Sequence, residues 1–320
     1  MNRRSLLIAV AAPALASRVS RAQPGPWPSR PIRLVVGAPG GPLDVVARSF
    51  AEPLGAALGQ PVVVENRVGA GTTLATEAVA RAAPDGYNLL VSNVAGHAIG
   101  PFVYPTIRYD PLRDFTEIAL LAEVPLALAV NAEAPLGSLA AFLDAARRAP
   151  GGLRVGTQGN GTSSHVTLEL LQRLAAVELT HVPYRPGTSV ATDLIAGRIE
   201  ATITSVVETG RNDRLRLLAV TSPARHPRWP EVPTFRESGL PMEAAIWMGL
   251  SAPAGLPEPI ADRLHREVAL AAGRADVLAR LAALGASPRR AMTRAEFAGF
   301  VAAEIARWSD LVRAARIRAD

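Results

Sequence analysis

The sequence lacks several residues and motifs on which whole classes of function depend. It contains no cysteine, which excludes disulfides, thiolate catalysis and cysteine-based metal sites. The five histidines, at positions 97, 165, 181, 226 and 265, lack the His-x-x-x-His spacing of a metal site. A nucleotide P-loop, a G-x-G-x-x-G motif and a G-x-S-x-G nucleophile elbow are also absent. We therefore expect no metal, no cofactor and no enzyme activity.

Lysine is absent as well, so every basic side chain apart from histidine is an arginine. The chain has 34 basic and 28 acidic residues, a net charge of +6. Four of the arginines lie in residues 1–22, which leaves 30 bases against 28 acids, or +2, in the remaining chain. A nearly neutral chain does not have the basic footprint of a nucleic-acid-binding protein, and we expect no such partner.

Long apolar runs are missing except near the N-terminus, where residues 1–22 have the pattern of an export signal. Arg3 and Arg4 precede an apolar segment at 6–16, and Ser20-Arg21-Ala22 offers small residues at the −3 and −1 positions of a cleavage site. The segment is too short to span a bilayer permanently. We expect cleavage before Gln23. The paired arginines suggest export by the twin-arginine route. An uncleaved anchor is the alternative.

The rest of the chain, in a sequence that is 49% hydrophobic, alternates short apolar runs with helical patterns. This alternation predicts βα units and a mostly parallel sheet, whose ligands bind at the carboxyl ends of the strands. We expect strands at 32–36, 61–64, 87–91, 126–130, 153–156, 179–182, 199–204 and 215–220. Helices are expected at 44–58, 73–82, 138–148, 163–174, 188–196, 260–272, 276–284 and 293–316, the last opened by a Thr293–Glu296 capping box.

The loop Pro39-Gly40-Gly41-Pro42-Leu43-Asp44 lies between the first strand and the first helix. Such a loop directs backbone N–H groups and the positive end of the helix dipole at one spot, which suits a carboxylate or a phosphate. Asp44 is placed to cap the helix. An ordinary strand-to-helix turn explains the same residues. The loop at 157–165 repeats the pattern in the second half, with small residues and hydroxyls at a helix start.

Many short motifs occur in one order along the chain. They include Pro39–Asp44, Gly59-Gln60-Pro61-Val62-Val63-Val64-Glu65-Asn66-Arg67, Ala83-Pro84-Asp85-Gly86-Tyr87, His181-Val182-Pro183-Tyr184-Arg185, Asp193-Leu194, Leu218-Ala219-Val220-Thr221 and Val232-Pro233-Thr234. In these motifs, and over nearly the whole chain after residue 26, the sequence resembles the substrate-binding proteins of tripartite tricarboxylate transporters, often called Bug receptors.

The resemblance implies an α/β, two-domain periplasmic binding protein of type II, a Venus flytrap, each domain being a mostly parallel sheet flanked by helices. Domain 1 would comprise 31–124 and 248–320, and domain 2 would comprise 125–247, with crossings near 123–125 and 246–249. Such a receptor, expected to be a monomer, captures a small di-, tricarboxylate or related organic acid in the interdomain cleft and delivers it to membrane permease subunits. A receptor that signals to a membrane sensor would have the same fold and is the alternative.

Three departures from the family's pattern put its usual ligand set in question. The first loop reads Gly37-Ala38-Pro39-Gly40-Gly41, one residue shorter than the usual Pro-Phe-x-Pro-Gly-Gly and without its aromatic residue. The segment 208–214 is shorter than usual, and Pro186 replaces a glycine.

The candidate ligand-binding residues come from loops in both halves. They are Gly40, Gly41, Asp44, Asn93, His97, Asn160, Gly161, Thr162, Ser163, His165, Tyr184, Arg185 and Asp193. The glycines allow close backbone approach, the hydroxyls and amides can donate to an anion, and Arg185 can hold a carboxylate bidentately. Each has a structural alternative: Asp44 and Asp193 as braces, His97 and His165 as core residues, and Arg185 as a solvated surface residue.

Overall fold

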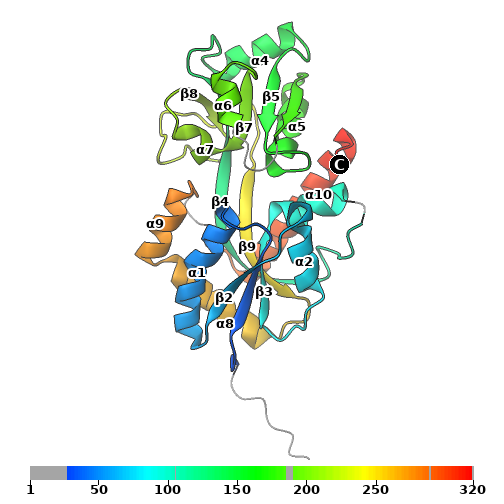
Figure 1. The fold of residues 1–320 in the computed structure, drawn as a ribbon, viewed down its shortest axis with the longest axis vertical. Helices are drawn as coiled ribbons and strands as arrows, with labels where there is room; N and C mark the ends of the chain where they lie inside the picture. Colours follow the sequence, from blue (N-terminus) through cyan, green and yellow to red (C-terminus); the bar gives the residue numbers. More distant parts are fainter. Residues whose placement is uncertain (1–26, 105, 185–189, 288–289, 319–320) are drawn as a thin grey trace, which may run out of the picture.

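The computed structural model describes residues 27–104, 106–184, 190–287 and 290–318. Two lobes follow one another along the long axis, each with strands at its centre and helices outside (Figure 1). In the described ranges, no helix is both long and apolar enough to cross a bilayer. The predicted signal segment and Arg185 lie outside the described residues.

A single nine-stranded sheet runs through both lobes. Its order is β2-β1-β3-β9-β4-β7-β5-β6, and β8 pairs with β4 beside this path. The strands are β1 (Ile32–Val36), β2 (Val62–Asn66), β3 (Asn88–Asn93), β4 (Phe115–Asn131), β5 (Arg154–Thr157), β6 (Thr180–Pro183), β7 (Ala201–Ser205), β8 (Leu215–Val220) and β9 (Ala245–Pro253).

The strand pairing follows the predicted βα units at the outside of each lobe and departs from them at the centre. β1 pairs in parallel with β2 and β3 in the first lobe, and β5 pairs in parallel with β6 and β7 in the second. The long strand β4 pairs antiparallel with β9 as far as Pro125 and antiparallel with β7 from Leu126 onward. Only its last part, 126–130, was predicted as a strand. The α/β fold class is confirmed, with antiparallel crossing strands as an addition.

Ten α-helices and two short helical segments surround the sheet in the described ranges. They are α1 (Pro42–Leu58), η1 (Ala70–Thr72), α2 (Thr73–Ala80), the π-helix η2 (Ala95–Ile99), α3 (Gly100–Val103), α4 (Leu139–Arg148), α5 (Ser163–Ala175), α6 (Val190–Ile195), α7 (Val206–Gly210), α8 (Glu258–Ala272), α9 (Ala275–Ala283) and α10 (Arg294–Ala315). The predicted capping box opens α10, with Thr293 and Glu296 bonded reciprocally.

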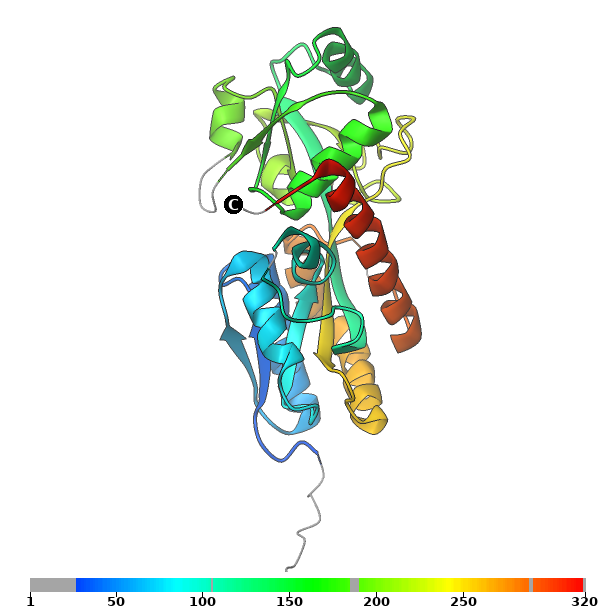
Figure 2. The same ribbon diagram turned by 90° about the vertical axis from the view of Figure 1, so that its right-hand side faces the viewer.

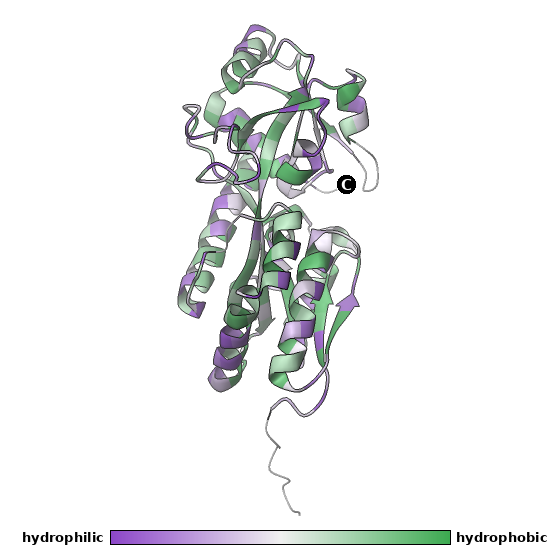
Figure 3. Cartoon of the chain, turned by 90° about the vertical axis from the view of Figure 1, so that its left-hand side faces the viewer, coloured by the Kyte–Doolittle hydropathy of each residue, from purple (hydrophilic) through white to green (hydrophobic). Residues whose placement is uncertain are grey.

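Buried apolar side chains of the sheet and the helices pack together in clusters, and much of the strands is coloured as hydrophobic in Figure 3. In the first lobe, Phe50 and Leu54 of α1 pack with Ile32 of β1 and Leu264 of α8 in one buried cluster. A second cluster joins the inner faces of α4 and α5 to the crossing strands and α10. Burial of a large apolar side chain contributes roughly 1.5–3 kcal/mol, so these clusters provide the main stabilisation of a chain without disulfides.

The C-terminal helices return to the first lobe, as the family resemblance implied. α8 and α9 pack against α1, and α10 packs against η2 and β4. In addition, α10 reaches α5 of the second lobe, so this helix (red in Figure 2) lies along both lobes. The two lobes are therefore joined by strands and by a helix.

Candidate ligand-binding site

The carboxyl ends of the parallel strands in the two lobes face each other across the crossing strands. Asn93, at the end of β3, pairs with Met248 of β9, and Met248 pairs with Ala122 of β4. Ser205, at the end of β7, pairs with Leu126, which also lies in β4. The two edges are therefore four residue steps apart along β4, from Ala122 to Leu126, a distance of about 13 Å at 3.3 Å per residue. We call them the first-lobe edge and the second-lobe edge.

The loop before α1 presents backbone groups at the first-lobe edge. Gly40 has a φ of +68°, which favours glycine, and Gly41 is the N-cap residue, with no side chain capping the helix. A Cβ atom added at Gly41 would meet nothing within 4 Å. Pro42 at the first helical position has no N–H to satisfy. The loop thus leaves the start of a 17-residue helix without a side-chain cap, which is the kind of helix start that can receive an anion.

Asp44 braces this loop. Its carboxylate accepts hydrogen bonds from Arg48 Nε (2.9 Å) and Asn66 Nδ2 (3.3 Å), and from the backbone of Gly40. The hydrogen bond from Arg48 is the largest of the effects that lower the pKa of Asp44. The helix begins at Pro42, so the predicted N-cap role of Asp44 is wrong, whereas its predicted bracing role agrees with these contacts.

Asn93 and His97 are both buried beneath the first-lobe edge. Asn93 accepts a hydrogen bond from the Gly96 backbone (2.9 Å) and exchanges hydrogen bonds with the Thr72 hydroxyl. Asn93 is thus held by the turn into η2, and the hydroxyl of Thr72, the residue before α2, makes no capping hydrogen bond to that helix.

His97 has an exposed fraction of 0% and lies against the ring of Phe115, with centroids 4.6 Å apart. Its Nε2 atom is 3.5 Å from Glu117 Oε1. Because the ring is enclosed by the core, the prediction that His97 contacts a ligand is wrong for this conformation, and the core alternative holds.

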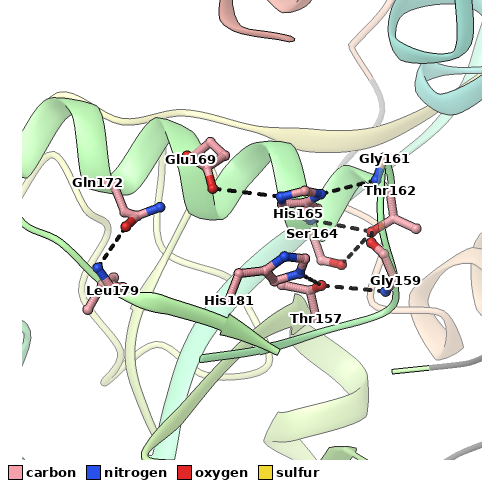
Figure 4. Close-up of polar contacts among 10 residues, drawn as sticks. All are labelled: Thr157, Gly159, Gly161, Thr162, Ser164, His165, Glu169, Gln172, Leu179 and His181. Atoms are coloured by element: carbon pink, nitrogen blue, oxygen red, sulfur yellow. Dashed lines mark hydrogen bonds and ion pairs between the residues drawn. The ribbon is translucent and has the colours of Figure 1, made fainter. Parts of the chain in front are cut away.

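At the second-lobe edge, the loop 157–165 is held largely by its own polar groups (Figure 4). The hydroxyl of Thr162 caps α5 by accepting a hydrogen bond from the His165 backbone and donates to the carbonyl of Gly159. The Gly161 N–H donates to His165 Nδ1 at 3.1 Å. Two of the predicted ligand donors, Thr162 and Gly161, therefore donate their hydrogen bonds within the loop itself. The hydroxyl of Ser163 has no hydrogen bond in the described part of the chain.

His165 and His181 form a stacked pair beneath this loop. Their ring centroids are 3.9 Å apart at an interplanar angle of 18° (Figure 4). His181 Nε2 lies 2.6 Å from the Thr157 hydroxyl, and His165 Nε2 lies 3.7 Å from a carboxylate oxygen of Glu169. Burial, followed by the proximity of His165, lowers the pKa of His181 to about 4, although Glu169 opposes the shift. His181 is therefore neutral at neutral pH. Of these two histidines, only His165 was among the predicted ligand-binding residues.

Tyr184 and Asp193 form a second brace at this edge. The Tyr184 hydroxyl donates to Asp193 Oδ2 (2.8 Å), and Arg198 donates to Oδ1 (2.9 Å). Burial and the hydrogen bond to Asp193 raise the pKa of Tyr184 to about 12, while the hydrogen bonds from Tyr184 and Arg198 lower the pKa of Asp193. This agrees with the predicted bracing role of Asp193.

Glu208, in α7, is a polar residue of this edge that the predictions missed. Its carboxylate accepts hydrogen bonds from Gln158 Nε2 at 2.8 and 2.7 Å, and one from the Thr204 hydroxyl. A cue is present in the sequence, because Gln158 and Thr204 come at the ends of two predicted strands. Their contact with Glu208 depends on the parallel pairing of β5 and β7.

The two lobes, with the carboxyl ends of their parallel strands facing each other, define a class of protein: a two-lobed solute-binding protein. Residues 46–317 match the family described as the tripartite tricarboxylate transporter family receptor. The chain belongs to this family.

Solved structures and a sequence relative agree with this assignment. The chain is similar to MatC (Rpa3494) from Rhodopseudomonas palustris with bound malate (36% identity, TM-score 0.76, covering 89% of this chain and 100% of that one). It is also similar to R. palustris Rpa4515 with adipate (34% identity, TM-score 0.78, covering 91% and 99%). Protein BugT of Bordetella pertussis is 37% identical over 293 residues, which cover 90% of each chain.

Proposed function

We propose that this protein captures a small organic carboxylate between the first-lobe and second-lobe edges and delivers it to the permease subunits of a tripartite tricarboxylate transporter. The observation that carries the proposal is the uncapped start of α1 opposite a second polar edge, in a family whose members include MatC with malate and Rpa4515 with adipate. Ligand binding by a receptor of this kind needs positioned donors and no reacting group.

The finer features of the receptor follow from the same proposal. Domain 1 comprises 31–124 and 248–320, domain 2 comprises 125–247, and β4 changes partner between Pro125 and Leu126, at the proposed boundary. Residues 1–22 are removed on export to the periplasm, where the receptor acts as a monomer. Gly40, Gly41, Asn160 and Ser163 remain the residues proposed to touch the ligand, and the role of Arg185, which lies outside the described residues, stays a prediction.

A thermal-shift screen of the purified exported protein against mono-, di- and tricarboxylates tests the function. We expect at least one carboxylate to raise the melting temperature, because a ligand that binds only the folded state stabilises it by mass action. Small-angle scattering should then show the protein contract with that ligand, as expected when one ligand touches both lobes. Failure of every carboxylate to bind would refute the proposal.

Mass spectrometry of the exported protein tests the localisation. We expect an N-terminus at Gln23 and material in the soluble periplasmic fraction. An intact Met1 on membrane-bound protein would contradict cleavage without bearing on the ligand.

A further inference from the structure

Glu208 differs from the other acidic residues at the two edges because its described partners are all neutral. Asp44 is paired with Arg48, Glu65 with Arg67, and Asp193 with Arg198, each at 2.7–2.9 Å. Glu208 is bonded only to the amide of Gln158 and the hydroxyl of Thr204 within the described ranges. Its negative charge is therefore not neutralised by an ion pair there.

The carboxylate of Glu208 lies at the second-lobe edge and is open to solvent. Gln158 directly follows β5, and Thr204 is the penultimate residue of β7, so both partners mark the carboxyl ends of these parallel strands. The residue itself is exposed. A carboxylate has about four lone-pair sites, and three hydrogen bonds occupy three of them. One acceptor site remains for a ligand.

A ligand that spans the two edges meets opposite conditions at its two ends. The start of α1 at the first-lobe edge favours a carboxylate. At the second-lobe edge, a second ionised carboxylate close to Glu208 would be repelled, since like charges a few ångströms apart oppose each other. A hydroxyl or ammonium group there would instead donate a charge-assisted hydrogen bond to Glu208.

We infer that Glu208 determines ligand specificity by selecting monocarboxylates whose far end carries a hydroxyl or ammonium group, and by disfavouring dicarboxylates of the same length. This inference rests on the proposed function and narrows its ligand class. The bound dicarboxylates of MatC and Rpa4515 make the comparison direct, because both ligands carry two carboxyl groups.

Two matched sets of probes test the inference by calorimetry on the full exported protein. One set is adipate, 6-hydroxyhexanoate and 6-aminohexanoate; the other is succinate, 4-hydroxybutanoate and 4-aminobutanoate. In the set that fits the site, we expect the wild type to bind a hydroxy or amino acid about tenfold or more tighter than the dicarboxylate. The substitution Glu208→Gln keeps the side chain's size and an acceptor for Gln158, and should reduce this preference to about threefold or less.

Glu178→Gln is the matched control, because Glu178 is exposed and lies before β6, away from the carboxyl ends of the strands. It should keep the wild-type preference. The inference is overturned if the wild type binds the dicarboxylate as tightly as its partners, if Glu208→Gln leaves the preference unchanged, or if the wild type binds none of the six probes. A thermal shift with any other carboxylate would still support the proposed receptor in each of these outcomes.

Discussion

The stacked pair His165 and His181 predicts a loss of stability in mild acid. The folded-state pKa of His181 is about 4, below the ordinary 6.5. Since the unfolded chain takes up the proton first, the neutral ring contributes stability that is complete above pH 6.5 and is lost as the pH falls toward 4. Glu169 and His165 are the charged or titratable groups that act on the ring, with opposite effects.

The size of the effect follows from the shift. A pKa lowered from 6.5 to about 4 corresponds to at most about 3 kcal/mol of unfolding free energy. Because the His181 ring is only partly buried, solvent screening reduces this to about 2 kcal/mol. Protonation also places a cation against the ring of His165, whose Nδ1 accepts the Gly161 N–H, so the loop 157–165 should loosen as well.

Urea denaturation at pH 7 and at pH 4.5 measures this contribution. In His181→Gln the amide can still reach Thr157 but cannot titrate, so the loss between the two pH values should be about 1–2 kcal/mol smaller than in the wild type. His265→Gln, in the first lobe, controls for the removal of an imidazole. Equal losses in the wild type and in His181→Gln would refute the argument.

Three further substitutions test the two edges. Gly41→Val should weaken carboxylate binding about tenfold, because the new side chain starts in open space at the helix start and crowds the approach of a ligand; equal affinity by calorimetry would contradict it. Thr162→Val removes the cap of α5 and should lower the unfolding free energy by about 1 kcal/mol in urea; an unchanged unfolding free energy would contradict the role of this cap. Asp44→Asn should destabilise the protein at pH 7, and the deficit should shrink as the pH falls below 3.8, because the lowered pKa of Asp44 gives stability that is lost as the carboxylate is protonated; a deficit independent of pH would argue against the brace.

Local signals in the sequence predicted the outer parts of the fold well. The capping box at Thr293 and Glu296 depends on residues three positions apart, and it forms as expected. The strand at 215–220 also has its predicted bounds. In these segments the local pattern and the tertiary environment favour the same structure.

The crossing strands could not be predicted in the same way. β4 is buried on both faces over most of its length, so its sequence has neither the alternation of a half-buried strand nor a helical period. Its change of partner at Pro125 depends on contacts with β9 and β7, which come about 80 to 120 residues later in the chain.

The same limit applies to the site. Position along the chain placed His97 in a polar loop, but β3 continues to Asn93 and the π-helix turns the His97 ring into the core. Glu208 was passed over because its partners Gln158 and Thr204 come from two other segments, which only the sheet brings together. The position of a residue in the sequence was enough to assign it to one of the two edges. The direction of its side chain depends on tertiary packing and could not be predicted.

The paired crossing strands also have a mechanical consequence. β4 and β9 stay hydrogen-bonded to each other up to Pro125 and Ala245, and α10 presses on α5 beside them. Any change in the angle between the lobes must therefore bend the paired strands β4 and β9 and move α10 along α5. The free energy needed for this bending reduces the free energy that ligand binding releases. A substitution that makes the paired strands more flexible, far from both edges, would raise affinity without touching the ligand.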